Sequence, residues 1–227
     1  MHKLDIPRPV VDRVVGRRGR LHIIDRIDPQ RTALVIIDMQ NAYLVENHPG
    51  FARHGVDIIP KINDLAFAFR RAGSRVIWIR NTIDKGGDRV WPTYSELRTA
   101  EARSRMEVAL AKGSEGHAIS PNMGLEPDDL IIDKYRYSAF IQGSSDIEQH
   151  LRVLAVDTLI ICGVLTNVCC ESTARDAMML NYRVAMAAEG TAAHTDLEYN
   201  GSLASILFAF GDVMTNDEIL ERLPRLK

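Results

Sequence analysis

Five short apolar runs recur along the chain, and their unbroken apolarity restricts the fold more than any other feature of the sequence. A strand with one face in water alternates apolar and polar residues. A strand buried on both faces is apolar at nearly every position, as in a parallel sheet covered by helices. The runs predict buried strands at residues 33–38, 74–80, 129–133, 158–162 and 182–187.

The segments between these runs carry a helical pattern. Apolar residues recur there at spacings of three and four, and Gly73 stands where the first helix would end. The predicted helices cover residues 56–72, 146–154, 167–180 and 197–210. Right-handed crossovers then give an α/β fold: a Rossmann-like, doubly wound, mainly parallel sheet of five or six strands with helices on both faces. Ligands bind such sheets beyond the carboxyl ends of the strands.

Length and charge favour one domain that acts on a small molecule. A chain of 227 residues fits a single core, and its formal net charge of -2 offers no attraction to nucleic acid or to an acidic membrane. No run reaches the roughly 18 to 20 apolar residues of a membrane span. Residues 1–30 are rich in Arg without the apolar core of a signal peptide. We expect an N-terminal arm at 1–30, one domain at 31–227 and a cytoplasmic protein.

Two segments interrupt the alternation of strands and helices. Residues 81–96 and 112–127 are rich in Gly and Pro, which predicts long loops. Long loops in a compact domain are often lids or rims of a site, although solvated excursions are about as common. We expect these two loops to set the choice of substrate.

The three cysteines, Cys162, Cys169 and Cys170, lie within nine residues of one another. Adjacent cysteines bridge each other only with considerable strain, so a structural disulfide framework is not expected. In a reducing compartment a cysteine more often packs as a small apolar residue than reacts. A reactive role for any of them therefore depends on what surrounds it.

Three residues with suitable chemistry follow three different predicted strands. Asp38 ends the first strand, Lys134 follows the third, and Cys169 follows the fourth at the start of a helix. Because the carboxyl ends of parallel strands meet at one edge of the sheet, these side chains are expected to lie together. An Asp that closes a strand commonly caps a turn, and a Lys beyond a strand is commonly solvated. The three residues together are therefore stronger evidence for a reactive site than any one of them alone.

A nucleophilic cysteine needs a proton acceptor and groups that stabilise its thiolate form. A thiol with its ordinary pKa of about 8.5 is mostly protonated near neutral pH, and the thiolate is the nucleophile. A carboxylate such as Asp38 can take the proton, while an ammonium such as Lys134 and the positive end of a helix stabilise the anion. In the turn that leads into this helix, the backbone N–H groups of Leu165 and Cys169 could receive an oxyanion. The alternative is an ordinary turn capped by Thr166 or Asn167.

Three strings of residues resemble the signatures of isochorismatase-like cysteine hydrolases, and the likeness runs from about residue 30 to residue 222. The strings are Thr32-Ala-Leu-Val-Ile-Ile-Asp-Met-Gln-Asn-Ala-Tyr43, Asp133-Lys-Tyr-Arg-Tyr-Ser-Ala-Phe140 and Cys162-Gly-Val-Leu-Thr-Asn-Val-Cys-Cys-Glu-Ser-Thr-Ala-Arg-Asp-Ala177. The resemblance implies that Asp38 accepts a proton, Lys134 assists and Cys169 attacks, with Cys170 left to pack. It also implies a cis peptide between Val164 and Leu165, where Leu165 replaces a residue that is commonly small.

The resemblance further narrows the reaction. Nicotinamidases of this family bind a metal through an Asp and closely spaced histidines, but no histidine follows Asp84 before Trp91. We therefore expect no metal, no organic cofactor and no nicotinamidase activity. Isochorismatases themselves lack the nucleophilic cysteine, so Cys169 favours C–N cleavage. The strings are most similar to the ureidoacrylate and N-carbamoyl amidohydrolase branch, in which Asn81 and Tyr137 would line the substrate site.

The expected function is hydrolysis of a small ureido, carbamoyl or amide substrate through a thioester. The alternatives are a family hydrolase with another small substrate and a non-catalytic module that binds a metabolite. The resemblance also implies a homo-oligomer, either a dimer or a tetramer. Residues flanking the catalytic strings are candidates for contact with the substrate, although the aromatic ones more often pack in a core. These candidates are Asn41, Tyr43, Trp78, Asn81, Tyr137 and Phe140.

Overall fold

The chain folds around a parallel sheet whose strands are nearly all inaccessible to water. The computed structural model describes residues 2–84, 86 and 89–224, and within them it has a six-stranded sheet with the order β3-β2-β1-β4-β5-β6. The strands are β1 (Thr32–Ile37), β2 (Arg75–Asn81), β3 (Leu130–Lys134), β4 (Thr158–Val164), β5 (Arg183–Ala192) and β6 (Asp212–Met214). Every strand pairs with its neighbours in parallel. The predicted α/β class and doubly wound sheet are confirmed.

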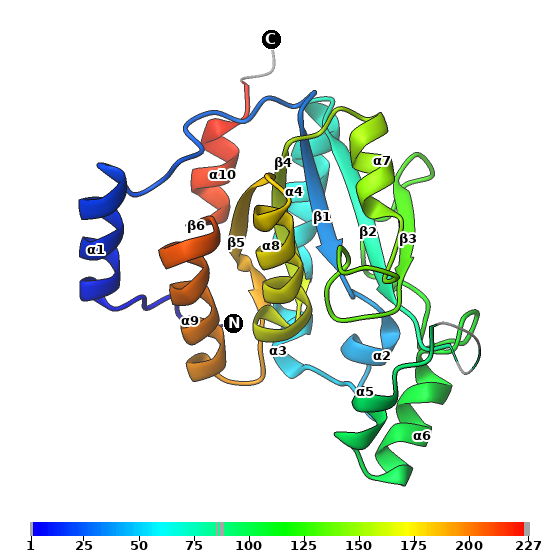
Figure 1. Ribbon diagram of the computed structural model, residues 1–227. Helices are drawn as coiled ribbons and strands as arrows, with labels where there is room; N and C mark the ends of the chain where they lie inside the picture. The colour runs from blue at the N-terminus through cyan, green and yellow to red at the C-terminus, as the bar shows by residue number, and fades with distance from the viewer. Residues whose placement is uncertain (1, 85, 87–88, 225–227) are drawn as a thin grey trace.

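Helices cover both faces of the sheet (Figure 1). One face packs against α1 (Arg8–Arg18), α7 (Ile147–Val153), α8 (Glu171–Met179) and α9 (Asp196–Ser205). The other face packs against α3 (Arg53–Asp57), α4 (Ile59–Arg71) and α10 (Asn216–Arg222). The π-helical turns η2 (Thr166–Cys170) and η3 (Ile206–Phe210) adjoin α8 and α9. The two central strands, β1 and β4, are buried at every residue because both of their faces are covered.

Three further helices lie beyond the carboxyl ends of the strands, toward the bottom of Figure 1. They are α2 (Asn41–Leu44), α5 (Pro92–Glu96) and α6 (Ala100–Ala109). The predicted loop 81–96 therefore contains a helix, while its residues 85, 87 and 88 lie outside the described residues. The segment 112–127 has no helix, and it packs over α2, where the N–H of Ala42 donates to the carbonyl of Gly116.

The strand order reverses between β1 and β4, the two central strands, which run parallel to each other. Because chain order runs outward from this pair on both sides, their carboxyl ends form the crevice at which such folds bind ligands. Gly163, near the end of β4, has a φ of 114°, and any side chain there would collide with the backbone of Ile37. Glycine thus lets β4 approach β1 closely at the place where Asp38 and Cys169 leave the sheet.

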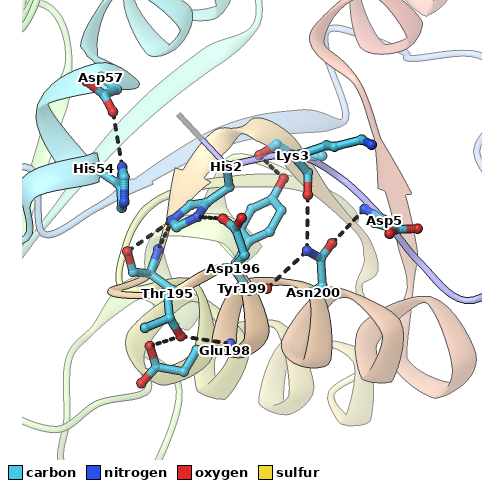
Figure 2. Close-up of polar contacts among 12 residues, drawn as sticks. His2, Lys3, Asp5, His54, Asp57, Thr195, Asp196, Glu198, Tyr199 and Asn200 are labelled. Carbon is cyan, nitrogen blue, oxygen red and sulfur yellow. Dashed lines mark hydrogen bonds and ion pairs between the residues drawn. The ribbon is translucent and has the colours of Figure 1, made fainter.

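The N-terminal segment packs against its own chain. Val14 of α1 is fully buried, and Arg18 donates to the carboxylate of Asp212. Figure 2 shows His2, Lys3 and Asp5 beside the start of α9. His2 Nδ1 is 2.6 Å from Asp196 Oδ1, and the His2 ring stacks on Tyr199 with 4.7 Å between centroids. Residues of this N-terminal segment thus pack against α9 and β6.

Within the described part of the chain, no helix is both long enough and apolar enough to cross a membrane.

Candidate active site

Asp38, Lys134 and Cys169 meet at the carboxyl edge of the sheet. The ammonium Nζ of Lys134 lies 2.9 Å from Asp38 Oδ2 and 3.3 Å from Cys169 Sγ. The side chains of Lys134 and Asp38 are 0% and 1% exposed, and Cys169 is 5% exposed. The three residues thus form one buried cluster in which the lysine joins the acid to the thiol.

Each member of this cluster is positioned by a different element. Asp38 follows β1 with a φ of 56°, a left-handed conformation that Asp tolerates better than most residues, so the chain turns sharply off the strand. Lys134 is the last residue of β3, which lies two strands from β1, and its long side chain spans the end of β2. Cys169 lies in η2, one turn beyond β4. Three strand ends of one rigid sheet therefore hold the cluster.

Burial and charge together set the protonation of the cluster. Burial raises the pKa of the Asp38 carboxyl, although Lys134 and Cys169 act in the opposite direction. Burial and the negative charge of Asp38 raise the pKa of the Cys169 thiol far above its usual value. Burial acts to lower the pKa of Lys134, but Asp38 and Cys169 outweigh it and the net shift is upward. Burial therefore favours the protonated thiol at Cys169, while Lys134 favours the carboxylate form of Asp38.

The turn before Cys169 has unusual backbone geometry. The peptide bond between Val164 and Leu165 is cis, at the position that the family resemblance implies. The carbonyl of Leu165 accepts hydrogen bonds from the N–H groups of Val168 and Cys170, which turn the chain into η2 and then α8. Cys170 is fully buried, with its Sγ 3.9 Å from the carbonyl of Cys162. Of the two adjacent cysteines, Cys169 is the one beside Lys134 and Asp38.

A cavity of about 320 Å³ opens onto this cluster. Six of the residues singled out in the sequence line it: Asp38, Tyr43, Asn81, Tyr137, Leu165 and Cys169. Lys134 lies behind the cavity wall, in contact with Asp38 and Cys169. The amide Nδ2 of Asn81 donates to the hydroxyl of Tyr43 at 2.6 Å, so these two polar walls are fixed against each other.

Three predicted contact residues lie elsewhere. Trp78 is 1% exposed in the core, where its Nε1 donates to Asp129. Phe140 packs against Tyr182, with 5.5 Å between ring centroids, and Asn41 donates to the carbonyl of Glu115. These three side chains do not line the cavity, because side chains close together on one strand or turn point in different directions.

The outer wall of the cavity is formed by residues that carry no signature in the sequence. Helices α5 and α6 and the turn between them contribute Tyr94, Arg98 and Arg105, and the loop before α9 contributes His194. Of the two predicted loops, 81–96 contributes Asn81 and Tyr94 to the lining of the cavity, and 112–127 contributes no lining residue. No spacing marks isolated arginines as different from those on an ordinary charged surface.

Some histidines of the chain have protein partners of their own. His48 pairs with Glu115, and His54 pairs with Asp57. His117 is buried and shares a hydrogen bond with the hydroxyl of Thr82. In the part of the chain that the structure describes, no group of three or more His, Cys, Asp or Glu side chains is arranged to hold a metal ion.

Comparison with known proteins agrees with the fold and the signatures. The isochorismatase domain family matches residues 32–218. A ureidoacrylate amidohydrolase RutB from Pseudomonas savastanoi pv. phaseolicola is 33% identical over 207 residues, which cover 85% of this chain and 84% of that protein. The RutB of Agrobacterium fabrum is 34% identical over 178 residues, covering 73% of this chain and 77% of that protein.

Among solved structures, a cysteine hydrolase from Pseudomonas syringae pv. phaseolicola superposes with a TM-score of 0.79 and 29% identity, over 87% of this chain and 94% of that one. The match to the domain family extends from β1 to α10 and includes all three signatures and the buried cluster between them. This chain is therefore a hydrolase of the isochorismatase family.

Proposed function

We propose that the protein is a cysteine-dependent amidohydrolase that cleaves the C–N bond of a small linear ureido, carbamoyl or amide substrate. One observation carries the proposal: Cys169 Sγ lies 3.3 Å from Lys134 Nζ, which lies 2.9 Å from Asp38, at the wall of a cavity. A nucleophile, a proton acceptor and a cation in contact are the parts that acyl transfer through a thiol requires. The ureidoacrylate amidohydrolases to which the chain is similar support the choice of a C–N bond.

Attack begins with a proton transfer. The pKa of the Cys169 thiol is raised by burial, so the free enzyme holds little thiolate, and the proton must leave as the sulfur attacks. Asp38 receives this proton, and burial helps because it raises the pKa of the Asp38 carboxyl. Lys134 remains an ammonium and offsets the negative charge that passes from Asp38 to the sulfur.

The substrate carbonyl then becomes tetrahedral, and its oxygen carries the negative charge. The N–H groups of Leu165 and Cys169 are the donors that we assign to this oxygen. Loss of one such donor typically lowers kcat by roughly 10²- to 10³-fold. The buried, preorganised turn suits this task because its dipoles need not reorient during the reaction.

Collapse of the tetrahedral species breaks the C–N bond. Asp38 returns its proton to the nitrogen, the amine leaves, and an acyl or carbamoyl thioester remains on Cys169. Asp38 then takes a proton from a water molecule that attacks the thioester carbonyl, and the thiol is restored with release of the acid or carbamic acid. Each step uses only residues of this chain and water.

The test is a release assay over ureido acids, carbamoyl amino acids, biuret-like compounds and simple amides, in which ammonia and amine are measured. Cys169→Ala should lower kcat by at least roughly 10⁴-fold, as removal of a nucleophile does in other hydrolases. Cys170→Ala is the matched control, because Cys170 is an adjacent buried thiol outside the cavity, and it should retain activity within a few fold.

Intact mass spectrometry adds a second readout, since a substrate that is slow in hydrolysis should leave an adduct on the wild type and on Cys170→Ala but not on Cys169→Ala. Unchanged turnover in Cys169→Ala would reject the nucleophile. An absence of turnover across the whole panel would favour the alternative of a non-catalytic binding module.

We also propose that the protein is a cytoplasmic homo-oligomer, a dimer or a tetramer, and that it does not bind nucleic acid. Support for the compartment comes from the cysteines, because all three are free thiols, as in reducing environments. Sedimentation velocity gives the oligomeric state directly, and a monomer across the micromolar range would contradict the assembly.

A further inference from the structure

We propose that Arg98, assisted by Arg105, forms a carboxylate-binding subsite in the catalytic cavity, so that the substrate is an anion: a short ureido, carbamoyl or amido acid. The inference rests on the proposed function for the scissile bond, and it adds the group that the enzyme recognises at the other end of the substrate. The outer wall of the cavity, which carries these two arginines, lies outside the three signature strings.

The charges that line the cavity do not balance. Asp38 is the one acidic side chain among the described lining residues, and its charge is already paired with Lys134. The outer wall adds the guanidinium groups of Arg98 and Arg105. Over the residues that the structure describes, neither guanidinium forms an ion pair with a carboxylate. An anion entering this cavity would therefore meet unpaired positive charge.

Arg98 is held in place, unlike a freely rotating surface arginine. Its guanidinium carbon lies 3.6 Å from the centroid of the Tyr94 ring, and its Nη1 donates to the Tyr94 carbonyl at 3.1 Å. Its Nη2 lies 3.5 Å from the hydroxyl of Tyr137. Tyr94 is 7% exposed, and Tyr94 and Tyr137 both line the cavity. The aromatic wall thus fixes the plane of the guanidinium.

This arrangement leaves donors for a ligand. A guanidinium has five N–H groups in a planar fork, and the contacts to Tyr94 and Tyr137 use two of them. The remaining N–H groups have the geometry to bind both oxygens of a carboxylate, which an ammonium cannot match. Arg105 is exposed and lies at the same cavity, so it adds charge without the same orientation.

A competing explanation is that Arg98 only supports the aromatic wall by stacking on Tyr94. The two roles differ in one measurable respect. A supporting role affects neutral and anionic substrates alike, whereas a carboxylate subsite affects only the anionic substrate. The comparison therefore needs substrates that share the scissile group and differ only in charge.

The probes are N-carbamoylglycine, N-carbamoyl-β-alanine and N-carbamoyl-4-aminobutyrate, each paired with its neutral primary carboxamide. Three chain lengths cover the unknown distance between Cys169 and the guanidinium. The wild type should prefer at least one acid over its carboxamide by about 10- to 100-fold in kcat/KM, the effect expected from hydrogen bonds to a charged group. Arg98→Met should remove this preference through KM for the acid, and Arg98→Lys should restore only part of it.

The matched control is Arg103→Met. Arg103 lies on α6 between Arg98 and Arg105 in sequence, pairs with Glu107 and does not line the cavity, so its removal changes the net charge equally. Arg103→Met should leave kcat/KM for the acid and for the carboxamide within about twofold of the wild type. Arg105→Met should lower kcat/KM for the acid less than Arg98→Met does. An equal loss for acid and carboxamide in Arg98→Met, or a wild type with no preference for any acid, would overturn the subsite.

A binding experiment tests recognition of the carboxylate separately from catalysis. Cys169→Ala cannot form the thioester, yet it keeps the outer wall, so calorimetric titration with the same acids and carboxamides measures recognition alone. Acid binding that Arg98→Met abolishes in this background supports the subsite even where no probe is hydrolysed. Acid binding that is unchanged by Arg98→Met, or absent for all three lengths, rejects the subsite whether or not the hydrolase activity is established.

Discussion

The inner and outer walls of the catalytic cavity are built in opposite ways. The inner wall, with Asp38 and Cys169, lies at strand ends in the centre of the sheet and is almost completely buried. The outer wall is formed by α5, α6 and the turn between them, beyond the sheet, and its two arginines reach the solvent: Arg98 is partly buried and Arg105 is exposed. On the proposed function, the residues that react lie on the sheet, which fixes distances of about 3 Å, and the residues that recognise the substrate lie on a segment beyond the sheet.

The largest expected effect is on the inner wall. Asp38→Asn keeps the shape of the side chain but removes the proton acceptor, so kcat should fall by about 10²- to 10⁴-fold while binding of substrate changes little. Steady-state kinetics with separate kcat and KM values check this. If KM rises and kcat stays, the inner wall is a binding surface and the contrast between the two walls fails.

Lys134→Met should affect both stability and the pH profile. It leaves the Asp38 carboxylate buried without its cation, and removal of one partner from a buried pair costs about 3 to 5 kcal/mol in the free energy of unfolding. Denaturant unfolding measures this loss. On the outer wall, Arg98→Met should cost much less stability, because Arg98 is only partly buried and has no carboxylate partner to strand among the described residues.

The pH profile follows from the shifted pKa of Asp38. Burial raises this pKa, and Asp38 accepts a proton only as a carboxylate, so kcat/KM should fall on the acid side at a pH above the ordinary aspartate range. Lys134 opposes the upward shift, so Lys134→Met should move the acid limb to still higher pH. Arg98→Met should not shift the acid side of the pH profile measured with a neutral carboxamide. A Lys134→Met limb at lower pH would contradict the assigned base.

Tyr94→Ala tests how the outer wall holds its arginine. The substitution removes the ring beneath Arg98, with the guanidinium 3.6 Å from its centroid, and retains the backbone carbonyl that accepts from Nη1. A released guanidinium must be reordered by the substrate, so KM for an acid should rise by about 3- to 10-fold, the range of one immobilised side chain. The kcat should be unaffected. A loss confined to kcat would mean that Tyr94 acts on the inner wall.

The smallest expected effect is at the N-terminal segment, near the loop that brings His194 to the cavity. His2 contacts Asp196 and the backbone of Ala193. His2→Ala should lower the free energy of unfolding by about 1 kcal/mol, typical of one lost hydrogen-bonded side chain, and change kcat/KM by less than about threefold. Thermal unfolding and steady-state kinetics measure the two effects. A large kinetic effect would extend the outer wall to this segment.

Several elements were readable from the sequence because local pattern and burial agree. The five predicted strands appear within one or two residues at their starts, since a strand covered on both faces must be apolar throughout. β6 was not predicted, because its three residues are too few to show a recognisable pattern of apolar residues. Helix α6 was missed because its charged residues give little amphipathic pattern.

The sequence by itself determined the fold class and the inner wall, because parallel strands place their carboxyl ends at one edge and Asp38, Lys134 and Cys169 each follow such an end. Only the tertiary structure decided that Trp78 and Phe140 turn into packed regions and that Arg98 and Arg105 face the cavity. The physical reason is that strand ends are fixed by a repeating hydrogen-bond register. The direction of a side chain on a short helix beyond the sheet depends on contacts between segments far apart in the chain.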